Sequence, residues 1–381
     1  SSAASVVYKR QMINGKINYF VGWIEDDEWL KYSIDVEDPG NFKILVEIAS
    51  FINGSKIALQ IDSSTTIGPI TLPNTKVFRL SSFLVKLSKP FKFLMPSRIK
   101  DMIDLMPSSF PKKNLPIKEV YKASGKKKVA RVALLTGCVQ KEISPQINEA
   151  TIRLLNRHGV EVVVPKKIRC CGSLNHHLGK EEDAHQDFKN NINTWYEEHQ
   201  KGNLDAILSN TSGCGTTMKD YGFIFRDDKE LSKKAKVISD LTRDISEYIF
   251  ESLKLDIKSK GKKYKVAYHS ACSMQHGQKV HAQPISLLEK TNKEIMEIPE
   301  GHICCGSAGT YNILQSKIAK QLLEKKVNNI ESLNPDFIST GNIGCITQIS
   351  HGTKVPILHT IEATLLFLSV PSAAWKKNPP I

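Results

Sequence analysis

The stretch "RCCGS" (Arg169–Ser173) recurs as "ICCGS" (Ile303–Ser307), 134 residues further along the chain. The whole chain has eight cysteines, so these two adjacent pairs account for half of them. The two cysteine sets are Cys138, Cys170, Cys171 and Cys214 in the first copy, and Cys272, Cys304, Cys305 and Cys345 in the second. Both copies keep the order C, CCG, C, with 32 residues from the first cysteine to the pair. The sequence therefore contains an internal repeat.

Regular elements surround the cysteines in the same order in both copies. A short apolar segment runs into the first cysteine, as "VARVALLTGC" (129–138) and "YKVAYHSAC" (264–272). The further predicted strands are 160–165, 205–210, 294–299 and 336–342, and the longest predicted helices are 179–199 and 315–333. Alternating strands and helices predict an α/β fold of two tandem, pseudo-repeated cysteine-rich units with parallel sheets.

The position of the cysteines after the predicted strands indicates their chemistry. The carboxyl ends of parallel strands meet at one edge of a sheet, so each copy is expected to gather four thiols from three loops there. Four thiolates repel one another unless a metal centre neutralises them, and both zinc and iron–sulfur clusters accept four sulfurs. Neighbouring side chains in extended backbone point apart, which favours the several metal ions of a cluster. Reversible disulfide chemistry and inert buried thiols are the alternatives.

Residues beside the cysteines support this prediction. Gly172 and Gly306 are expected to let the backbone turn close beside the inorganic core. Cys214 is expected to open a helix, whose amide dipoles favour the thiolate. Four histidines could serve as outer partners or occasional ligands, although a surface or hydrogen-bonding role is the ordinary expectation for each. They are His176, His177, His269 and His276.

Composition divides the chain into four predicted segments: 1–75, 76–130, 131–255 and 256–381. The first reads as a short all-β segment, and the last two are the cysteine-rich units. The net charge is +14, but residues 76–130 alone hold 14 Lys and Arg against 3 Asp and Glu. This basic helical connector is expected to face a partner or anionic lipid. No nucleic-acid-reading motif accompanies the charge, so we expect no nucleic-acid partner.

The N-terminal segment resembles part of a family 6 carbohydrate-binding module, a β-sandwich of the jelly-roll type. The resemblance covers about residues 20–75 and rests on "VGWIEDDEWLKYSIDV", "NFKILVEIAS" and "GPITLPNT". It implies a partial jelly-roll. Trp23, Trp29 and Tyr32 are expected to fill the core of that sheet rather than bind a sugar.

No apolar run reaches the length that spans a bilayer, and the first residues lack the pattern of a signal peptide. We therefore expect a soluble, cytoplasmic protein, with a peripheral contact at the inner face of the cell membrane as a further possibility. Cysteines in a reducing compartment more often bind metal or carry out redox chemistry than form disulfides.

From about residue 80 to 370 the sequence resembles the cysteine-rich CCG proteins, and most closely the iron–sulfur subunits of glycolate oxidases. The resemblance rests on "TSGCGTTMKDYG", "CCGSAGTYNILQ", "GNIGCITQI" and "LHTIEATL". It implies that all eight cysteines are cofactor and metal ligands, for a 4Fe-4S cluster of cubane or non-cubane type, with zinc in one unit as an alternative. The ferredoxin-like motif CxxCxxCxxxCP with which that family begins does not occur in this chain.

The resemblance also implies a function. The chain would be an electron-transfer subunit of a flavin-dependent 2-hydroxy-acid (glycolate) dehydrogenase, without a complete active site or catalytic residues of its own. FAD would be held by a partner subunit, a further complex subunit would be present, and electrons would pass towards quinone at the membrane. The alternatives are thiol–disulfide chemistry, as in the related CCG-containing subunit of heterodisulfide reductase, and carbohydrate binding through residues 1–75.

Overall fold

The computed structural model describes two separate compact units, residues 1–74 and 75–381. The described residues are 9–13, 16–20, 56–61, 65–71, 115, 118–124, 128–253, 255, 263–291 and 293–369. Most of the basic connector predicted at 76–130 therefore lies outside the described residues.

Unit 1–74 contains two antiparallel strand pairs. Strand β1 (Lys9–Ile13) pairs with β2 (Lys16–Phe20), and β3 (Lys56–Ile61) pairs with β4 (Thr65–Thr71). The two pairs agree with the all-β character predicted for residues 1–75. The stretches 21–36 and 41–50, which include Trp23, Trp29 and Tyr32, lie outside the described residues, so the resemblance to a carbohydrate-binding module stays a prediction.

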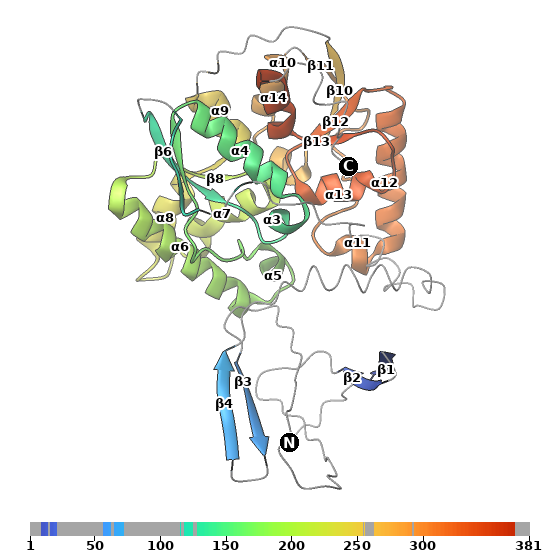
Figure 1. The fold of residues 1–381 in the computed structure, drawn as a ribbon. Coiled ribbons are helices and arrows are strands. Elements are labelled where there is room, and N and C mark those ends of the chain that lie inside the picture. The colour runs from blue at the N-terminus through green and yellow to red at the C-terminus, as the bar shows by residue number, and fades with distance from the viewer. Residues whose placement is uncertain are drawn as a thin grey trace. The chain divides into compact units, whose positions relative to one another are not determined.

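The first half of unit 75–381 contains a five-stranded sheet in the order β5-β7-β6-β8-β9, drawn in green and yellow in Figure 1. Only β5 runs antiparallel to its neighbour. The strands are β5 (Val120–Tyr121), β6 (Ala130–Leu135), β7 (Val160–Val163), β8 (Ala206–Ser209) and β9 (Thr242–Asp244). All four residues of β8 are buried, as expected for a parallel sheet covered on both faces.

The second half repeats this arrangement in a fully parallel sheet of order β11-β10-β12-β13. Its strands are β10 (Tyr264–Tyr268), β11 (Lys293–Met296), β12 (Phe337–Thr340) and β13 (Ile357–His359). In both halves the second strand lies outside the first, and the third and fourth follow on the other side. The predicted α/β repeat with parallel sheets is therefore confirmed.

Helices connect the strands and cover both faces of each sheet (Figure 1). In the first half they are α3 (Gln140–Ile143), α4 (Pro145–Arg157), α5 (Ser173–His177), α6 (Glu181–Gly202), α7 (Ser212–Ile224), α8 (Ser232–Leu241) and α9 (Ile245–Ser252). In the second they are the π-helix η2 (Ser273–Gln278), then α10 (Ala282–Glu289), α11 (Tyr311–Leu314), α12 (Ser316–Glu331), α13 (Ile343–Ser350) and α14 (Thr360–Ser369). Helices α6 and α12 confirm the two long helices predicted after the CCG motifs.

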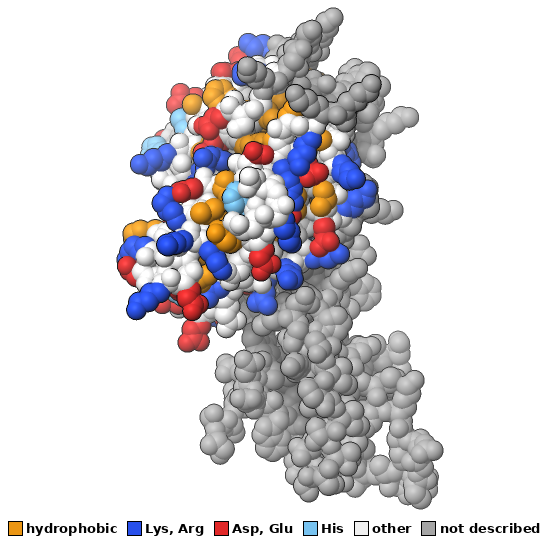
Figure 2. All heavy atoms as spheres, turned by 90° about the vertical axis from the view of Figure 1, so that its left-hand side faces the viewer, with side chains coloured by type: hydrophobic (Ala, Val, Ile, Leu, Met, Phe, Trp, Pro, Cys, Tyr) orange, Lys and Arg blue, Asp and Glu red, His pale blue; other side chains and the backbone are white. Residues whose placement is uncertain are grey.

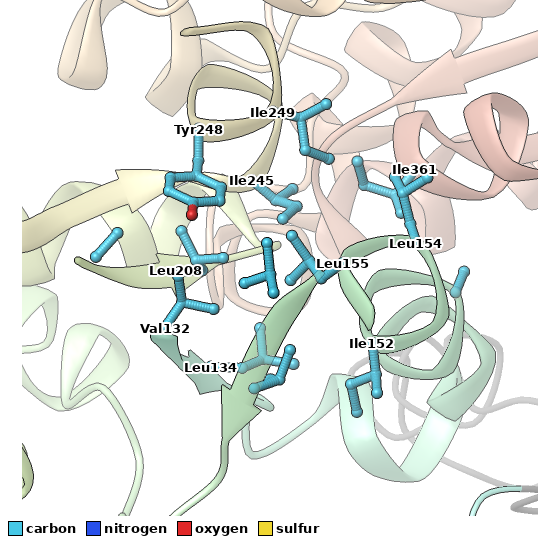
Figure 3. Packing of buried hydrophobic residues seen from close by; sticks show 14 of the residues in the cluster. Val132, Leu134, Ile152, Leu154, Leu155, Leu208, Ile245, Tyr248, Ile249 and Ile361 are labelled. Carbon is cyan, nitrogen blue, oxygen red and sulfur yellow. The ribbon is translucent and has the colours of Figure 1, made fainter. Parts of the chain in front are cut away.

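The two halves share one hydrophobic core, part of which is shown in Figure 3. Val132 and Leu134 of β6 pack with Leu154 of α4 on one face of the first sheet. Ile361 of α14, from the second half, belongs to the same cluster and is fully buried. The opposite face of the first sheet packs against α6, α7 and α8 in a separate cluster.

The exterior of the described region mixes charges of both signs. Figure 2 shows Lys and Arg side chains interspersed with Asp and Glu on the face that it presents. An extended basic surface is the usual electrostatic sign of nucleic-acid binding. Among the described residues, the face in Figure 2 carries no extended surface of a single charge sign.

Candidate metal centres

Three loops of the first half bring Cys138, Cys170, Cys171 and Cys214 to the carboxyl edge of the sheet. Cys138 follows β6, the adjacent pair follows β7, and Cys214 lies in the first turn of α7, directly after β8. The loops after β6 and β8 lie on either side of the point where the strand order reverses, which is where open α/β sheets bind ligands. The structure thus confirms that these cysteines gather after the strands and that Cys214 opens a helix.

The four sulfurs of the first set form a chain of contacts. The sulfurs of Cys138 and Cys170 are 3.3 Å apart, and the Cys171 thiol donates to the Cys214 sulfur over 3.1 Å. Cys170 thus contacts Cys138 and Cys171 contacts Cys214, but the two neighbouring side chains also interact with each other, so they do not simply point apart as the sequence predicted. None of the four forms a disulfide.

Protons are shared unequally within this set. The hydrogen bond from Cys138 lowers the pKa of the Cys170 thiol to about 3. The same hydrogen bond raises the pKa of Cys138, and hydrogen bonds to Cys170 and Cys214 raise the pKa of Cys171. In this set one thiolate is stabilised by protonated neighbours. A metal ion that binds there would displace those protons and take over the stabilisation of the thiolates.

Buried hydrogen bonds fix the backbone that carries the first pair. The Asn191 amide donates to the carbonyl oxygen of Cys170 over 2.7 Å, and the Tyr221 hydroxyl donates to that of Cys171 over 2.9 Å. Asn191 also accepts a hydrogen bond from the backbone N–H of Arg169 at 2.9 Å. Both side chains are fully buried, so α6 and α7 hold the two thiols in a fixed orientation.

The second half places Cys272, Cys304, Cys305 and Cys345 at the equivalent edge of its own sheet. Cys272 immediately precedes η2, the pair follows β11, and Cys345 lies in the first turn of α13. Cys305 and Cys345 are buried, and the backbone N–H of Gly306 donates to the Cys304 sulfur over 3.3 Å.

The second set also shares its protons. The hydrogen bond from Cys272 lowers the pKa of Cys304 to about 2, and the one from Cys305 lowers that of Cys345 to about 6. The pKa of each donating thiol changes in the opposite direction. The same hydrogen bonds raise the pKa of Cys272 and of Cys305. Each quartet therefore contains sulfurs that are ready to bind metal.

The four candidate histidines lie in different places. His276 is exposed on η2, and His176 and His177 lie on α5 with ring centroids 5.7 Å apart. His269, directly after β10, is only 1% exposed. One of its ring nitrogens and the sulfurs of Cys305 and Cys345 lie within 4.8 Å of one another.

Lys326 is a buried cation beside the second quartet that the sequence did not reveal. Its side chain lies on α12 with 1% exposure, and its ammonium group donates to the carbonyl oxygens of Glu300 at 3.2 Å and Gly301 at 3.3 Å. Burial lowers the pKa of Lys326, whereas the nearby cysteines, Cys305 foremost, act to raise it. In the sequence it is one lysine among several on a helix with a charged face, so no signal set it apart.

The donor set fits the inorganic groups expected from the sequence. Both quartets are built from thiols in mutual contact at the edge of a sheet, and zinc and iron–sulfur clusters are held in proteins by such sets of four sulfurs.

No helix in the described part of the chain has the length and apolar character needed to span a bilayer.

Comparison with known proteins agrees with this geometry. A family model for the cysteine-rich domain CCG matches residues 132–219 and 266–350. Each matched range contains one quartet and most of one parallel sheet. Two stretches of the chain thus match the CCG cysteine-rich domain.

Among curated proteins, the chain is similar to iron-sulfur subunits of glycolate oxidase. It is 36% identical over 232 residues to "Glycolate oxidase iron-sulfur subunit" of Escherichia coli (strain K12), a match that covers 61% of this chain and 56% of that protein. It is 27% identical over 238 residues to "Lactate utilization protein A" of Geobacillus sp. (strain WCH70), a match that covers 61% of this chain and 98% of that protein. The chain thus spans little more than half the length of the glycolate oxidase relative.

A search of solved structures found a hypothetical protein from Helicobacter pylori. The two chains are 12% identical with a TM-score of 0.47, and the match covers 78% of this chain and 58% of that one.

Proposed function

We propose that this chain is an iron–sulfur electron-transfer subunit of a flavin-dependent 2-hydroxy-acid dehydrogenase of the glycolate type. The observation that carries the proposal is the convergence of Cys138, Cys170, Cys171 and Cys214, with sulfur–sulfur contacts of 3.1 and 3.3 Å. The similarity to proteins named as glycolate oxidase iron-sulfur subunits supports the reaction class. When bound, an iron–sulfur cluster supplies one-electron transfer, whereas the chemistry on the hydroxy acid belongs to a flavin.

The proposed ligands are the eight cysteines, and the rest of the chain would position them. Asn191 and Tyr221 fix the carbonyl groups of the first pair and so limit the reorganisation of the thiolates. Cys171, Cys305 and Cys345 are buried, so each centre is shielded from water on one side. Cys138, Cys170 and Cys214 are partly exposed, which leaves an edge open for electron exchange with a partner.

The remaining parts of the proposal concern partners. A subunit that holds FAD, together with a further subunit of the complex, would deliver the electrons, and a quinone at the membrane surface would accept them. The basic segment 76–130 would form the contact with the flavin subunit or with anionic lipid. Residues 131–255 and 256–381 would each act as one cysteine-rich domain.

Anaerobic purification followed by iron, acid-labile sulfide and zinc analysis tests the cluster. We expect about four iron and four sulfide per chain for one 4Fe-4S cluster, with an EPR signal on reduction or oxidation. Cys171→Ser and Cys214→Ser should lose this iron, whereas Ser173→Ala, which alters the next helix but no proposed ligand, should keep it. A wild-type chain that binds zinc but no iron or sulfide would refute the proposal.

The electron-transfer role needs a second experiment. Co-expression with the flavin subunit and addition of glycolate or lactate should bleach the visible absorption of the cluster within the time of turnover. Cys171→Ser should abolish that bleaching while flavin reduction continues. If flavin reduction leaves the cluster oxidised in the intact complex, the chain is not the electron carrier.

A further inference from the structure

Ser212 is a fully buried residue at the start of α7, two residues before Cys214. Its backbone N–H donates to the Gly341 carbonyl oxygen over 3.1 Å, and its own carbonyl oxygen accepts a hydrogen bond from the Gln278 amide at 2.9 Å. Both partners belong to the second half of unit 75–381. The first turn of α7 is therefore held in part by the other half.

The Ser212 hydroxyl group also contacts the second half. Its oxygen lies 2.7 Å from the Ser273 hydroxyl oxygen and accepts a hydrogen bond from the Asn342 amide at 2.8 Å. Ser273 directly follows Cys272, and Asn342 caps the helix that carries Cys345. One hydroxyl group of the first half thus bonds to two of the three loops that hold the second quartet.

Helices α7 and η2 pack closely beside these hydrogen bonds. A Cβ on Gly215 of α7 would lie 2.7 Å from Nε2 of Gln278, and one on Gly277 of η2 would lie 2.7 Å from Cγ2 of Thr216. The Thr216 hydroxyl group also donates to the Ser273 carbonyl oxygen over 3.1 Å. Because each helix presents a glycine to a side chain of the other, the two cannot shift independently without a clash.

The contact through Ser212 is not repeated by symmetry. The equivalent position in the second half, two residues before Cys345, is Ile343, a buried hydrocarbon side chain. A second buried serine in the loop before α7, Ser209, donates instead to the Thr211 carbonyl oxygen of its own half at 2.9 Å. The side-chain contact between the halves at this point therefore depends on a single serine of the first half.

We propose that Ser212 is a positioning residue that couples the two quartets, so that metal binding by one set favours metal binding by the other. Cys214, Cys272 and Cys345 each lie within three residues of a member of this hydrogen-bonded group. A set that is ordered by its metal holds the group still, so the other set loses less conformational freedom when it binds. Linkage makes the coupling factor the same in both directions.

This inference rests on the proposed function only in that both quartets bind metal. It requires neither iron nor electron transfer. A cobalt(II) ion can therefore serve as the probe, because absorption bands between thiolate sulfur and cobalt report its binding.

Three anaerobic cobalt titrations of the full chain measure the coupling. They use the wild type, a Cys304→Ser, Cys345→Ser variant that keeps only the first set, and a Cys138→Ser, Cys170→Ser variant that keeps only the second. The wild type should bind two cobalt ions with an overall affinity about tenfold above the product of the two single-set affinities.

The same three titrations in a Ser212→Ala background test the role of the serine. We expect the coupling factor to fall below about twofold. Ser209→Ala is the matched control, since it removes a buried hydroxyl group that bonds within the first half, and it should keep the wild-type factor. A purely structural role for Ser212 would weaken the separate affinities and leave the factor unchanged.

Circular dichroism shows whether each variant folds. If Ser212→Ala does not fold, Ser273→Ala removes one of the two partners of the Ser212 hydroxyl group at a half-buried site. It should lower the coupling factor at least about twofold, and a folded Ser273→Ala with the wild-type factor would then overturn the proposal.

The outcomes separate this inference from the proposed function. A wild-type factor of one, a folded Ser212→Ala that keeps the wild-type factor, or a set that takes up no cobalt would overturn the coupling. The electron carrier would stand in each case if the chain still assembles iron and sulfide. A factor that is lost in Ser212→Ala, in a chain that never assembles iron and sulfide, would support Ser212 and refute the electron carrier.

Discussion

The glycines of the two CCG motifs have backbone conformations that other residues rarely adopt. Gly172 has φ +76° and Gly306 has φ +91°, so both lie in the left-handed region. A Cβ on Gly172 would lie 2.4 Å from Cε1 of Phe188, and one on Gly306 would lie 2.4 Å from the carbonyl oxygen of Ala319. The sequence predicted a turn at both glycines. The close neighbour that the structure shows at each is the following long helix.

Alanine substitutions should separate the cost of the turn from the cost of the contact. Gly179→Ala is the control, because Gly179 has φ +74° with no atom within 4 Å of the added Cβ, and it should cost about 1–2 kcal/mol. Gly306→Ala should cost more than about 3 kcal/mol, since a helix carbonyl group cannot move aside. Urea unfolding of Gly179→Ala, Gly172→Ala and Gly306→Ala measures how much free energy of unfolding each substitution removes. Equal losses in all three would show that only the turn matters.

His359 is a buried histidine that connects the two halves. Its Nε2 lies 2.9 Å from the carbonyl oxygen of Asn210 in the first half, and its Nδ1 accepts a hydrogen bond from the backbone N–H of Ile361 at 3.2 Å. The second hydrogen bond requires a neutral ring. Burial lowers the pKa of His359 from 6.5 to about 4.

Stability should therefore fall in acid. The unfolded chain takes up a proton near pH 6.5, while folded His359 resists protonation until about pH 4. The stabilisation is complete above pH 6.5 and is lost as the pH falls towards 4, by about 3 kcal/mol in total. Denaturant unfolding at pH 7 and pH 5 should show a smaller loss for His359→Gln than for the wild type. His351→Gln, at an exposed site, should behave as the wild type does.

At the scale of helices and strands, the repeat made much of the fold predictable. Apolar segments that end at Cys138 and Cys272 predicted β6 and β10, and the spacing of the CCG motifs predicted the equivalence of the halves. Residues whose roles depend on tertiary contacts could not be found in this way. Lys326 and Asn191 reach the cysteine loops from the middle of long helices, where lysine and asparagine are normally solvent-exposed. His269 was one of four candidates until its burial beside Cys305 set it apart.

Helix α12 offers a matched pair of lysines for a test of charge. Lys326 is buried near the second quartet, whereas Lys325 is half exposed and pairs with the Glu300 carboxylate at 2.7 Å. Lys326→Met should weaken metal binding in the second half by about 10–100-fold, because it removes the positive charge that favours an anionic centre. Lys325→Met should leave the affinity unchanged. Competition with a chelator measures both, and equal affinities in the two variants would contradict the role given to Lys326.

Across unit 75–381, the halves pack with approximate two-fold symmetry. Helix α4 follows the first strand of its sheet as α10 does, and α9 follows the fourth strand as α14 does. Contacts between the halves include those of α4 with α14 and of α9 with α10, so in these two pairs each helix packs against the counterpart of the other's partner (Figure 1). This reciprocal pairing is the pattern of an isologous interface between two copies. The repeat predicted the two copies, but no sequence feature revealed which helix faces pair, because buried faces look alike along the chain.

Several polar contacts between the halves lie beside the cysteines. The Ser212 and Ser273 hydroxyl oxygens are 2.7 Å apart, and the Asn342 amide donates to Ser212 over 2.8 Å. Ser212 begins the helix that carries Cys214, and Asn342 caps the helix that carries Cys345. The orientation of each cysteine set thus depends on the other half.

A shared core predicts that both halves unfold together. Ile361, in the second half, is fully buried among residues of the first, so Ile361→Ala should cost about 2–5 kcal/mol. Trp195 lies in the opposite cluster of the first half and can report on it alone in a chain whose Trp23, Trp29 and Trp375 are replaced by phenylalanine.

In that background, Ile361→Ala should move the Trp195 unfolding midpoint and the circular dichroism midpoint to lower urea by the same amount. Ile318→Ala, at a side chain that is 48% exposed, should change the free energy of unfolding by less than about 0.5 kcal/mol. If the Trp195 midpoint stays at its original value while part of the circular dichroism signal shifts, the halves unfold independently, and the core between α4 and α14 does not couple them.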